Sequence, residues 1–318
     1  MSAYPNLQVE SAMITIYSVG KRRHPSKFQC IIDGTARSLP PVRARNGVPC
    51  WTYVVGSCCS FCLSEKAEIT MRLSGAGFDS TSGTLMWWTL SMVAFPEVQH
   101  RAQAEIDAVV GRARTPTFAD ALKLPYVRAI IKEVLRWRPI VERGLPHKAA
   151  KDDWYEGMFI PKGATCMANI WHCNHDQAVF GDDADEFRPE RHLDAKGDEV
   201  LPGPRETNGE GHVTYGFGRR ICVGKYLAND SLFINIATIL WAAKLECARD
   251  ENGKELPPDP NAFVDNGIMT LVQSSMDEFW DVAEFLACSH PAPYDCMVTP
   301  RFPEVLSILA DEKGNFED

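Results

Sequence analysis

The sequence contains no apolar run long enough to cross a membrane. Its best candidate, Trp51–Leu63, holds three cysteines and is interrupted by Gly56 and Ser57, whereas a spanning helix needs about 20 apolar residues. The N-terminus also lacks the basic start and apolar run of a signal peptide. We therefore expect this chain to carry no membrane anchor of its own.

A surplus of positive charge is missing as well. The 318 residues include 33 Lys and Arg against 42 Asp and Glu, which gives a formal net charge of −9. This balance argues against a general phosphate-binding surface and therefore against nucleic acid as a partner. A convincing dinucleotide-binding fingerprint is also missing.

The cysteines lack the pattern of a disulfide framework or a zinc site. Eleven scattered cysteines, an odd number in a chain of this length, suit a reducing compartment. Cys59 and Cys62 form a C-x-x-C pair without a second Cys or His pair at zinc spacing. His172 and His175 are expected in a loop rather than at a metal. Zinc or thioredoxin-like chemistry is therefore the weaker interpretation.

The sequence changes character near residue 65. Residues 1–64 show no sustained hydrophobic period and are predicted to be mostly irregular, with a short strand over Met13–Val19. Proline at helix starts and glycine at a helix end predict helices beyond that point. The predicted helices are Glu65–Ala94, one from Pro96 to a cap at Gly111, and one from Pro125 to just before Pro139.

The second half of the chain combines short strands with loops and one more helix. Short strands are predicted between Tyr155 and Ile170, with a turn over Ile160–Gly163. A loop-rich stretch follows over Trp171–Gly218, and a last helix over Gly224–Ala243. The predicted fold class is mainly α with a small β component.

Residues 215–224, with the sequence YGFGRRICVG, have features that suit a metal-ligating cysteine. A cysteine ligates iron as a thiolate, whose negative charge must be stabilised. Glycines allow a tight loop that approaches a flat ligand closely. Cys222 also stands at the start of a predicted helix, whose N-terminal dipole favours an anion. A lone cysteine is more often simply buried, and only the surrounding loop favours the metal.

This loop resembles the haem-binding loop of the cytochrome P450 family, in which an aromatic residue, glycines and an arginine surround one cysteine. The resemblance implies that Cys222 ligates the haem iron. It also implies haem contacts for Tyr215, Gly218, Arg220 and Gly224, with the arginine on a propionate. The family usually has Phe where this chain has Tyr215, so the aromatic shield is kept and a hydroxyl is added.

Two charged residues on the third predicted helix form a second resemblance. Glu133 and Arg136 are three residues apart and therefore share one helix face. Taken alone they could be a surface pair that contributes little. Their context, and Arg191 in the segment FRPERH, resembles the charged clamp of the same family. The resemblance implies that the three form a buried network behind the haem loop, with a structural role.

The segment AGFDST at 76–81 lies inside the first long helix. A hydroxyl there can bond to the preceding turn, distort the helix and open a groove. Taken alone this is a structural polar patch. It resembles the oxygen-binding helix of the family, which implies that Asp79 and a hydroxyl relay protons to dioxygen. Ser80 stands where the family usually has threonine, and Thr81 is the alternative.

The remaining haem contacts are less defined. His147 follows a proline at a place where the family often directs a basic side chain to a propionate, and Arg143 is the competing candidate. Each could equally be a loop residue that faces water.

The resemblance covers residues 65–270 and the terminal strand Cys296–Pro303. It implies a partial cytochrome P450 fold that lacks the N-terminal helices. We expect residues 1–64 to be an irregular segment and 65–318 to be the C-terminal part of a haem-thiolate domain. Residues 271–289 do not resemble the family and could be an insertion or a translated intron. Without the helices that cover the haem, the chain is expected to fold poorly or bind haem weakly.

The family implies a monooxygenase that inserts one oxygen atom of dioxygen into a small organic substrate and reduces the other atom to water. Electrons would come from an NADPH-dependent reductase, and the family implies a location at the endoplasmic reticulum membrane. The alternative is a truncated, catalytically inactive fragment. The sequence does not define the substrate.

Overall fold

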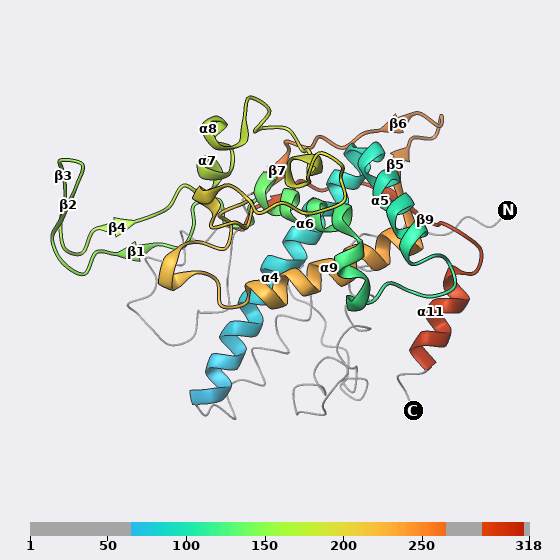
Figure 1. Cartoon of the computed structure of the whole chain (residues 1–318), viewed down its shortest axis with the longest axis horizontal. Helices are drawn as coiled ribbons and strands as arrows, with labels where there is room; N and C mark the ends of the chain where they lie inside the picture. Colours follow the sequence, from blue (N-terminus) through green and yellow to red (C-terminus); the bar gives the residue numbers. More distant parts are fainter. Residues whose placement is uncertain (1–64, 265–287, 315–318) are drawn as a thin grey trace.

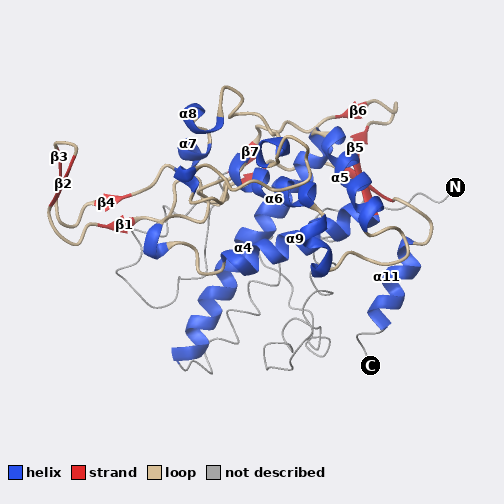
Figure 2. Ribbon diagram, viewed as in Figure 1, coloured by secondary structure: helices blue, strands red, loops and turns tan. Residues whose placement is uncertain are grey.

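The computed structural model describes residues 65–264 and 288–314, and helices account for most of its regular structure (Figure 2). This confirms the predicted fold class, mainly α with a small β component. The helices are α4 (Glu65–Ala94), α5 (Pro96–Val109), α6 (Pro125–Trp137), α7 (Ile170–Asn174), α8 (Gln177–Phe180), α9 (Lys225–Ala242) and α11 (Val305–Gly314).

The long helices α4, α5, α6 and α9 pack on one another around a shared apolar core (Figure 1). Both α5 and α6 begin with a proline, whose missing N–H costs nothing at that position. Gly111 has a φ of +73° and its N–H donates to the carbonyl of Ile106, so it follows the end of α5 as the sequence predicts. The largest fully buried side chains include Trp87, Trp88, Trp241, Ile130 and Leu232.

The strands form small separate sheets. They are β1 (His147–Lys148) with β4 (Thr165–Cys166), β2 (Asp153–Tyr155) with β3 (Met158–Ile160), β7 (Phe263–Val264) with β8 (His290–Pro291), and a three-stranded sheet in the order β6 (Glu255–Leu256), β5 (Ala243–Arg249), β9 (Cys296–Pro300). All pairs are antiparallel. Figure 1 shows the β2–β3 hairpin projecting away from the helical body at the left.

The sequence did not predict β5. The last long helix ends at Ala242, and the chain enters β5 at the next residue without a loop. Here Gln99, which is buried on α5, accepts from the N–H of Leu245 at 2.8 Å and donates to the Leu245 carbonyl at 2.8 Å. The side-chain amide thus pairs with the strand as a neighbouring backbone would. No local sequence pattern carries this long-range contact.

One prediction of local structure needs correction. The predicted turn over Ile160–Gly163 is shifted by one residue, because the N–H of Ala164 donates to the carbonyl of Pro161 at 3.0 Å. This shift places Gly163, with a φ of +88°, at the third position of the turn, where glycine is favoured. The stretch Trp171–Gly218 is rich in loops, as the sequence predicts, and its short elements are α8, most of α7 and several 3₁₀ turns.

Some predictions fall outside the described residues. These are the whole segment 1–64, with its predicted strand Met13–Val19 and the pair Cys59 and Cys62, and most of the unmatched segment 271–289. Within 65–264 and 288–314, no helix combines the length and apolarity that a bilayer crossing requires.

Replacing Gln99 by methionine should destabilise the fold, because methionine has a similar length but makes none of these hydrogen bonds. The backbone groups of Leu245 would stay buried without their partner, at a cost of about 2–4 kcal/mol. Urea denaturation followed by tryptophan fluorescence would measure the change. The matched control is Gln177→Met at an exposed position of α8, which should leave the unfolding midpoint unchanged, and equal midpoints for both variants would contradict the prediction.

Candidate haem-thiolate site

The cysteine loop is closed at its base by one backbone hydrogen bond. The N–H of Cys222 donates to the carbonyl of Tyr215 at 2.8 Å, and a 3₁₀ turn over Gly218–Arg220 lies between them. The side chain of Cys222 is exposed, and α9 starts three residues later with Gly224 as its N-cap. The thiol is therefore accessible and lies close to the positive N-terminal end of α9.

The glycines of this loop leave room for a flat ligand. Gly216 and Gly218 have φ values of +77° and +56°, which other residues rarely adopt. A Cβ placed on either would meet nothing within 4 Å, whereas one on Gly224 would lie 3.9 Å from the sulfur of Cys222. The loop thus combines open space with a single accessible thiol. A single thiol donor fits a haem iron, because the macrocycle itself supplies the nitrogen ligands.

No other metal site competes with it in the described part of the chain, where no cluster of three or more His, Cys, Asp or Glu is placed to hold an ion. His172 is exposed, while His175 stacks on Trp171 with ring centroids 4.1 Å apart.

Tyr215 joins the loop to its surroundings. Its hydroxyl donates to Oδ1 of Asn229 on α9 at 2.7 Å, and its ring packs edge-on against His212 at 5.1 Å. Burial, followed by the negative charges of Cys222 and Glu210, raises the pKa of the Tyr215 phenol. The hydroxyl therefore stays protonated and remains a hydrogen-bond donor.

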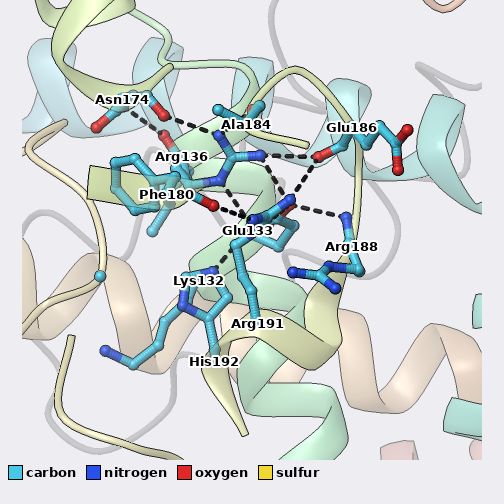
Figure 3. Close-up of polar contacts among 12 residues, drawn as sticks. Lys132, Glu133, Arg136, Asn174, Phe180, Ala184, Glu186, Arg188, Arg191 and His192 are labelled. Atoms are coloured by element: carbon cyan, nitrogen blue, oxygen red, sulfur yellow. Dashed lines mark hydrogen bonds and ion pairs between the residues drawn. The ribbon is translucent and has the colours of Figure 1, made fainter. Parts of the chain in front are cut away.

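The structure brings Glu133, Arg136 and Arg191 together in the interior (Figure 3). The carboxylate of Glu133 accepts from Nε and Nη2 of Arg136, both at 2.8 Å, and from Nε of Arg191 at 3.1 Å. The N–H of Arg188 and Nε2 of His192 complete its contacts. The side chains of Glu133 and Arg136 are fully buried, so this is not a surface pair.

The environment of Glu133 favours its charged form. Burial by itself would raise the pKa of this carboxyl, but the hydrogen bonds from Arg136 and His192 outweigh burial and lower the pKa to about 2. Burial also lowers the pKa of His192, more than its contact with Glu133 raises it. His192 therefore contributes mainly a neutral N–H donor, and the two arginines carry the compensating charge.

Asn174 links the clamp to the cysteine loop, and sequence reasoning missed it. Its backbone carbonyl accepts from Nη1 of Arg136 at 2.8 Å. Its side chain accepts from the N–H of Val213 at 2.8 Å and donates to Oγ1 of Thr214 at 3.0 Å. Asn174 is fully buried at the end of α7, inside the stretch predicted to be rich in loops. A lone asparagine in a polar segment gives no sequence signal for such a role.

The structure does not show the expected interruption of α4 at Asp79 and Ser80. The helix stays α-helical throughout, although the carbonyls of Asp79 and Ser80 accept hydrogen bonds from the hydroxyls of Ser82 and Thr84. These side-chain hydrogen bonds add to the backbone hydrogen bonds of the helix and do not interrupt it. The Asp79 and Ser80 side chains are half-buried, and Thr81 is buried.

Asp79 has a partner that the sequence did not indicate. Burial, followed by the charge of Asp79 and a hydrogen bond to it, raises the pKa of the Cys288 thiol to about 12. Beside it, the carbonyl of Ser289 accepts from Nε1 of Trp87 on α4 at 3.0 Å. The last residues of the segment 271–289 therefore lie against the helix that carries Asp79.

The predicted propionate contacts are all exposed. Arg220 closes the 3₁₀ turn of the cysteine loop and lies two residues from Cys222. His147 lies in β1, opposite Cys166, and Arg143 lies in the loop before it. Arg220 is the only one of these three that belongs to the cysteine loop itself.

The fold is rich in α-helix, a glycine-lined and exposed cysteine precedes a long helix, and a Glu–Arg–Arg clamp is buried. These features together are those of a haem-thiolate protein. The cytochrome P450 family profile matches residues 60–268. A cytochrome P450 monooxygenase of Armillaria gallica is 47% identical over 249 residues, covering 78% of this chain and 44% of that protein. Cytochrome P450 monooxygenase 58 of Postia placenta is 46% identical over 295 residues, covering 92% and 52%.

Among solved structures, a zebrafish cytochrome P450 determined with abiraterone aligns with a TM-score of 0.55 and 30% sequence identity, covering 71% of this chain and 46% of that one. The chain belongs to the cytochrome P450 family, and its fold is part of the P450 fold. Haem is the cofactor of this family. The chain spans about half the length of the curated relatives it matches.

Replacing Glu133 by glutamine should destabilise the protein strongly. The substitution keeps the shape but removes the charge, so the buried guanidinium of Arg136 loses its counter-ion and that of Arg191 keeps only its ion pair with Asp183. We expect this to cost about 3–5 kcal/mol. Chemical denaturation would measure the loss. As a matched control, Glu255→Gln removes an exposed ion pair with Arg249 and should cost less than about 1 kcal/mol. A small effect at Glu133 would show that the clamp does not support the fold.

Acidification should weaken the fold through His212 before it affects Glu133. Burial, followed by nearby positive charges, holds the pKa of His212 well below its ordinary 6.5. The unfolded chain therefore binds this proton more readily, so stability is fully present above pH 6.5 and declines below it. Urea denaturation at pH 7.5, 6.5 and 5.5 should show a flatter pH dependence in His212→Gln. The exposed His100→Gln variant should keep the wild-type slope, and an unchanged slope in His212→Gln would reject this role.

Proposed function

We propose that this chain provides the haem-binding half of a haem-thiolate monooxygenase, which inserts one oxygen atom of dioxygen into a small organic substrate and reduces the other to water. The single observation that carries the proposal is the exposed sulfur of Cys222, presented by a hydrogen-bonded glycine loop directly ahead of α9. Membership of the cytochrome P450 family supports it.

Each residue of the loop has a separate role in holding the cofactor. Cys222 would supply the thiolate ligand, and the N-terminal end of α9 would stabilise its charge. Gly218 and Gly224 allow close approach, and the ring of Tyr215 shields the ligand. Arg220 lies where it can pair with a propionate. When bound, the haem supplies the one-electron and dioxygen chemistry that side chains cannot perform.

Proton delivery is assigned to α4. Asp79 has a half-buried carboxylate and Ser80 a half-buried hydroxyl on the next residue. An acid beside a hydroxyl can accept protons from solvent and pass them toward the reacting oxygen. Thr81, which is buried, is the alternative hydroxyl. The contact between Asp79 and Cys288 occupies this acid in the present structure, so it must open for the relay to work.

The partners follow from the same proposal. Electrons come from an NADPH-dependent reductase, which suits a chain without a dinucleotide-binding fingerprint. The oxidised molecule is a small organic substrate. Besides Arg220, either His147 or Arg143 gives the haem a second basic contact. A location at the endoplasmic reticulum membrane is proposed from the family alone.

One observation favours the alternative, a catalytically inactive fragment. Large apolar side chains are exposed around the start of α9: Val223 just before it is 80% exposed, and Tyr226 and Leu227 in its first turn are 73% and 64% exposed. Phe217 in the loop is 42% exposed. Apolar surface of this extent beside the cysteine would normally be covered by other parts of a protein. A chain with this surface open to water could hold haem weakly and not turn over.

A reduced carbon-monoxide difference spectrum of the purified, haem-supplemented chain tests the proposal. We expect a Soret band at long wavelength, because only thiolate ligation produces it in this class. The band should be lost in Cys222→Ala and kept in Cys166→Ala, which removes an exposed cysteine of β4.

A well-folded sample that binds no haem would reject the proposed function. A band that persists in Cys222→Ala would reject the assigned ligand. If the band forms but NADPH oxidation with an added reductase and oxygen produces no oxidised substrate, the inactive fragment is the better description.

A further inference from the structure

The cysteine loop has little apolar packing to keep it in place. Phe217 is 42% exposed, Val223 is 80% exposed, and Cys222 itself is exposed. Gly216 and Gly218 add backbone freedom to the same loop. The position of the loop must therefore come mainly from hydrogen bonds at its base.

Tyr215 makes the two bonds that meet there. Its backbone carbonyl accepts the Cys222 N–H at 2.8 Å, which closes the loop. Its hydroxyl donates to Oδ1 of Asn229 at 2.7 Å, which ties the same residue to the first turns of α9. The Tyr215 side chain thus adds a second connection between the loop and the helix that follows it, besides the hydrogen bond from the Lys225 N–H to the Cys222 carbonyl at 3.4 Å.

The other side of Tyr215 is held independently. The two residues before it are bonded to the Asn174 side chain, through the N–H of Val213 and Oγ1 of Thr214. The ring packs on the buried His212. Because this side is fixed, the hydroxyl contact with Asn229 sets how far the loop stands from α9. An ion pair at 2.6 Å also joins Lys225, the first residue of α9, to Glu210, which precedes Tyr215 in the chain. This ion pair does not include a residue of the loop.

We propose that the hydrogen bond between Tyr215 and Asn229 is a latch that positions the Cys222 loop on α9. Asn229 is a positioning residue, because it acts on the cysteine only through Tyr215. The phenylalanine usual at this position of the family cannot form the bond. The inference rests on the proposed function for its consequence at the haem, which is a longer-lived thiolate bond.

Hydrogen exchange of the loop amides in the whole chain without haem tests the latch directly. Exchange of the Cys222 N–H reports opening of its bond to Tyr215. Tyr215→Phe and Asn229→Ala should each speed this exchange about 2- to 10-fold, the range expected for one hydrogen bond. The double variant should exchange no faster than either single variant, because both remove the same bond.

Three further variants separate the latch from general loosening. Asn229→Asp keeps an oxygen acceptor and should retain slow exchange. Asn235→Ala removes an asparagine of α9 that bonds within its own helix, and Tyr155→Phe removes an exposed hydroxyl of β2. Both should leave exchange of the Cys222 amide unchanged.

The second measurement is the rate at which the carbon-monoxide complex loses its long-wavelength Soret band. Tyr215→Phe and Asn229→Ala should accelerate the loss about 2- to 10-fold without adding in the double variant. Additive effects, or unchanged exchange in both single variants, would overturn the latch. If neither the wild-type chain nor any variant shows the band, but the exchange rates of the single and double variants are coupled as expected, the latch stands and the proposed function fails.

Discussion

The carboxylate of Glu133 is the point on which the supporting structure of the site depends. It projects from α6 into the protein interior, where it is fully buried. It accepts hydrogen bonds from Arg136, Arg188, Arg191 and His192. An isolated charge in such a place would cost several kcal/mol, so the carboxylate and the guanidinium groups of Arg136 and Arg191 keep one another charged. Burial and compensation come together here, since neither the acid nor the arginines could be buried alone.

Arg136 and Arg191 also fix the position of residues 174–186, which form little regular structure of their own. Arg136 donates to the carbonyls of Asn174, Ala184 and Glu186, and Arg191 donates to those of Phe180 and Asp183. These carbonyls belong to short helices and turns that cannot satisfy them internally. A rigid guanidinium with five donors meets several of them at once. The clamp thus organises the segment between α6 and the cysteine loop.

Support passes from this clamp to the cysteine through polar contacts rather than apolar packing. Arg136 fixes Asn174, the Asn174 side chain fixes Val213 and Thr214, and Tyr215 closes the loop on Cys222. This arrangement leaves the sulfur exposed on a surface with room above its glycines. A loop packed by apolar side chains could not stay open in this way, because a flat cofactor needs the same space.

The long helices of this protein follow from its sequence, because proline and glycine mark their ends and apolar residues repeat along them. The cysteine loop and the Glu133–Arg136 pair are also readable, since their spacing is local and their residue types are specific. Strand β5, the role of Asn174 and the contact between Asp79 and Cys288 are not readable. Each depends on partners far away in the chain, so only the tertiary structure decides them. The tertiary structure also decides that the Glu133–Arg136 pair is buried and forms a clamp, and that Asn229 lies close enough to accept from the Tyr215 hydroxyl.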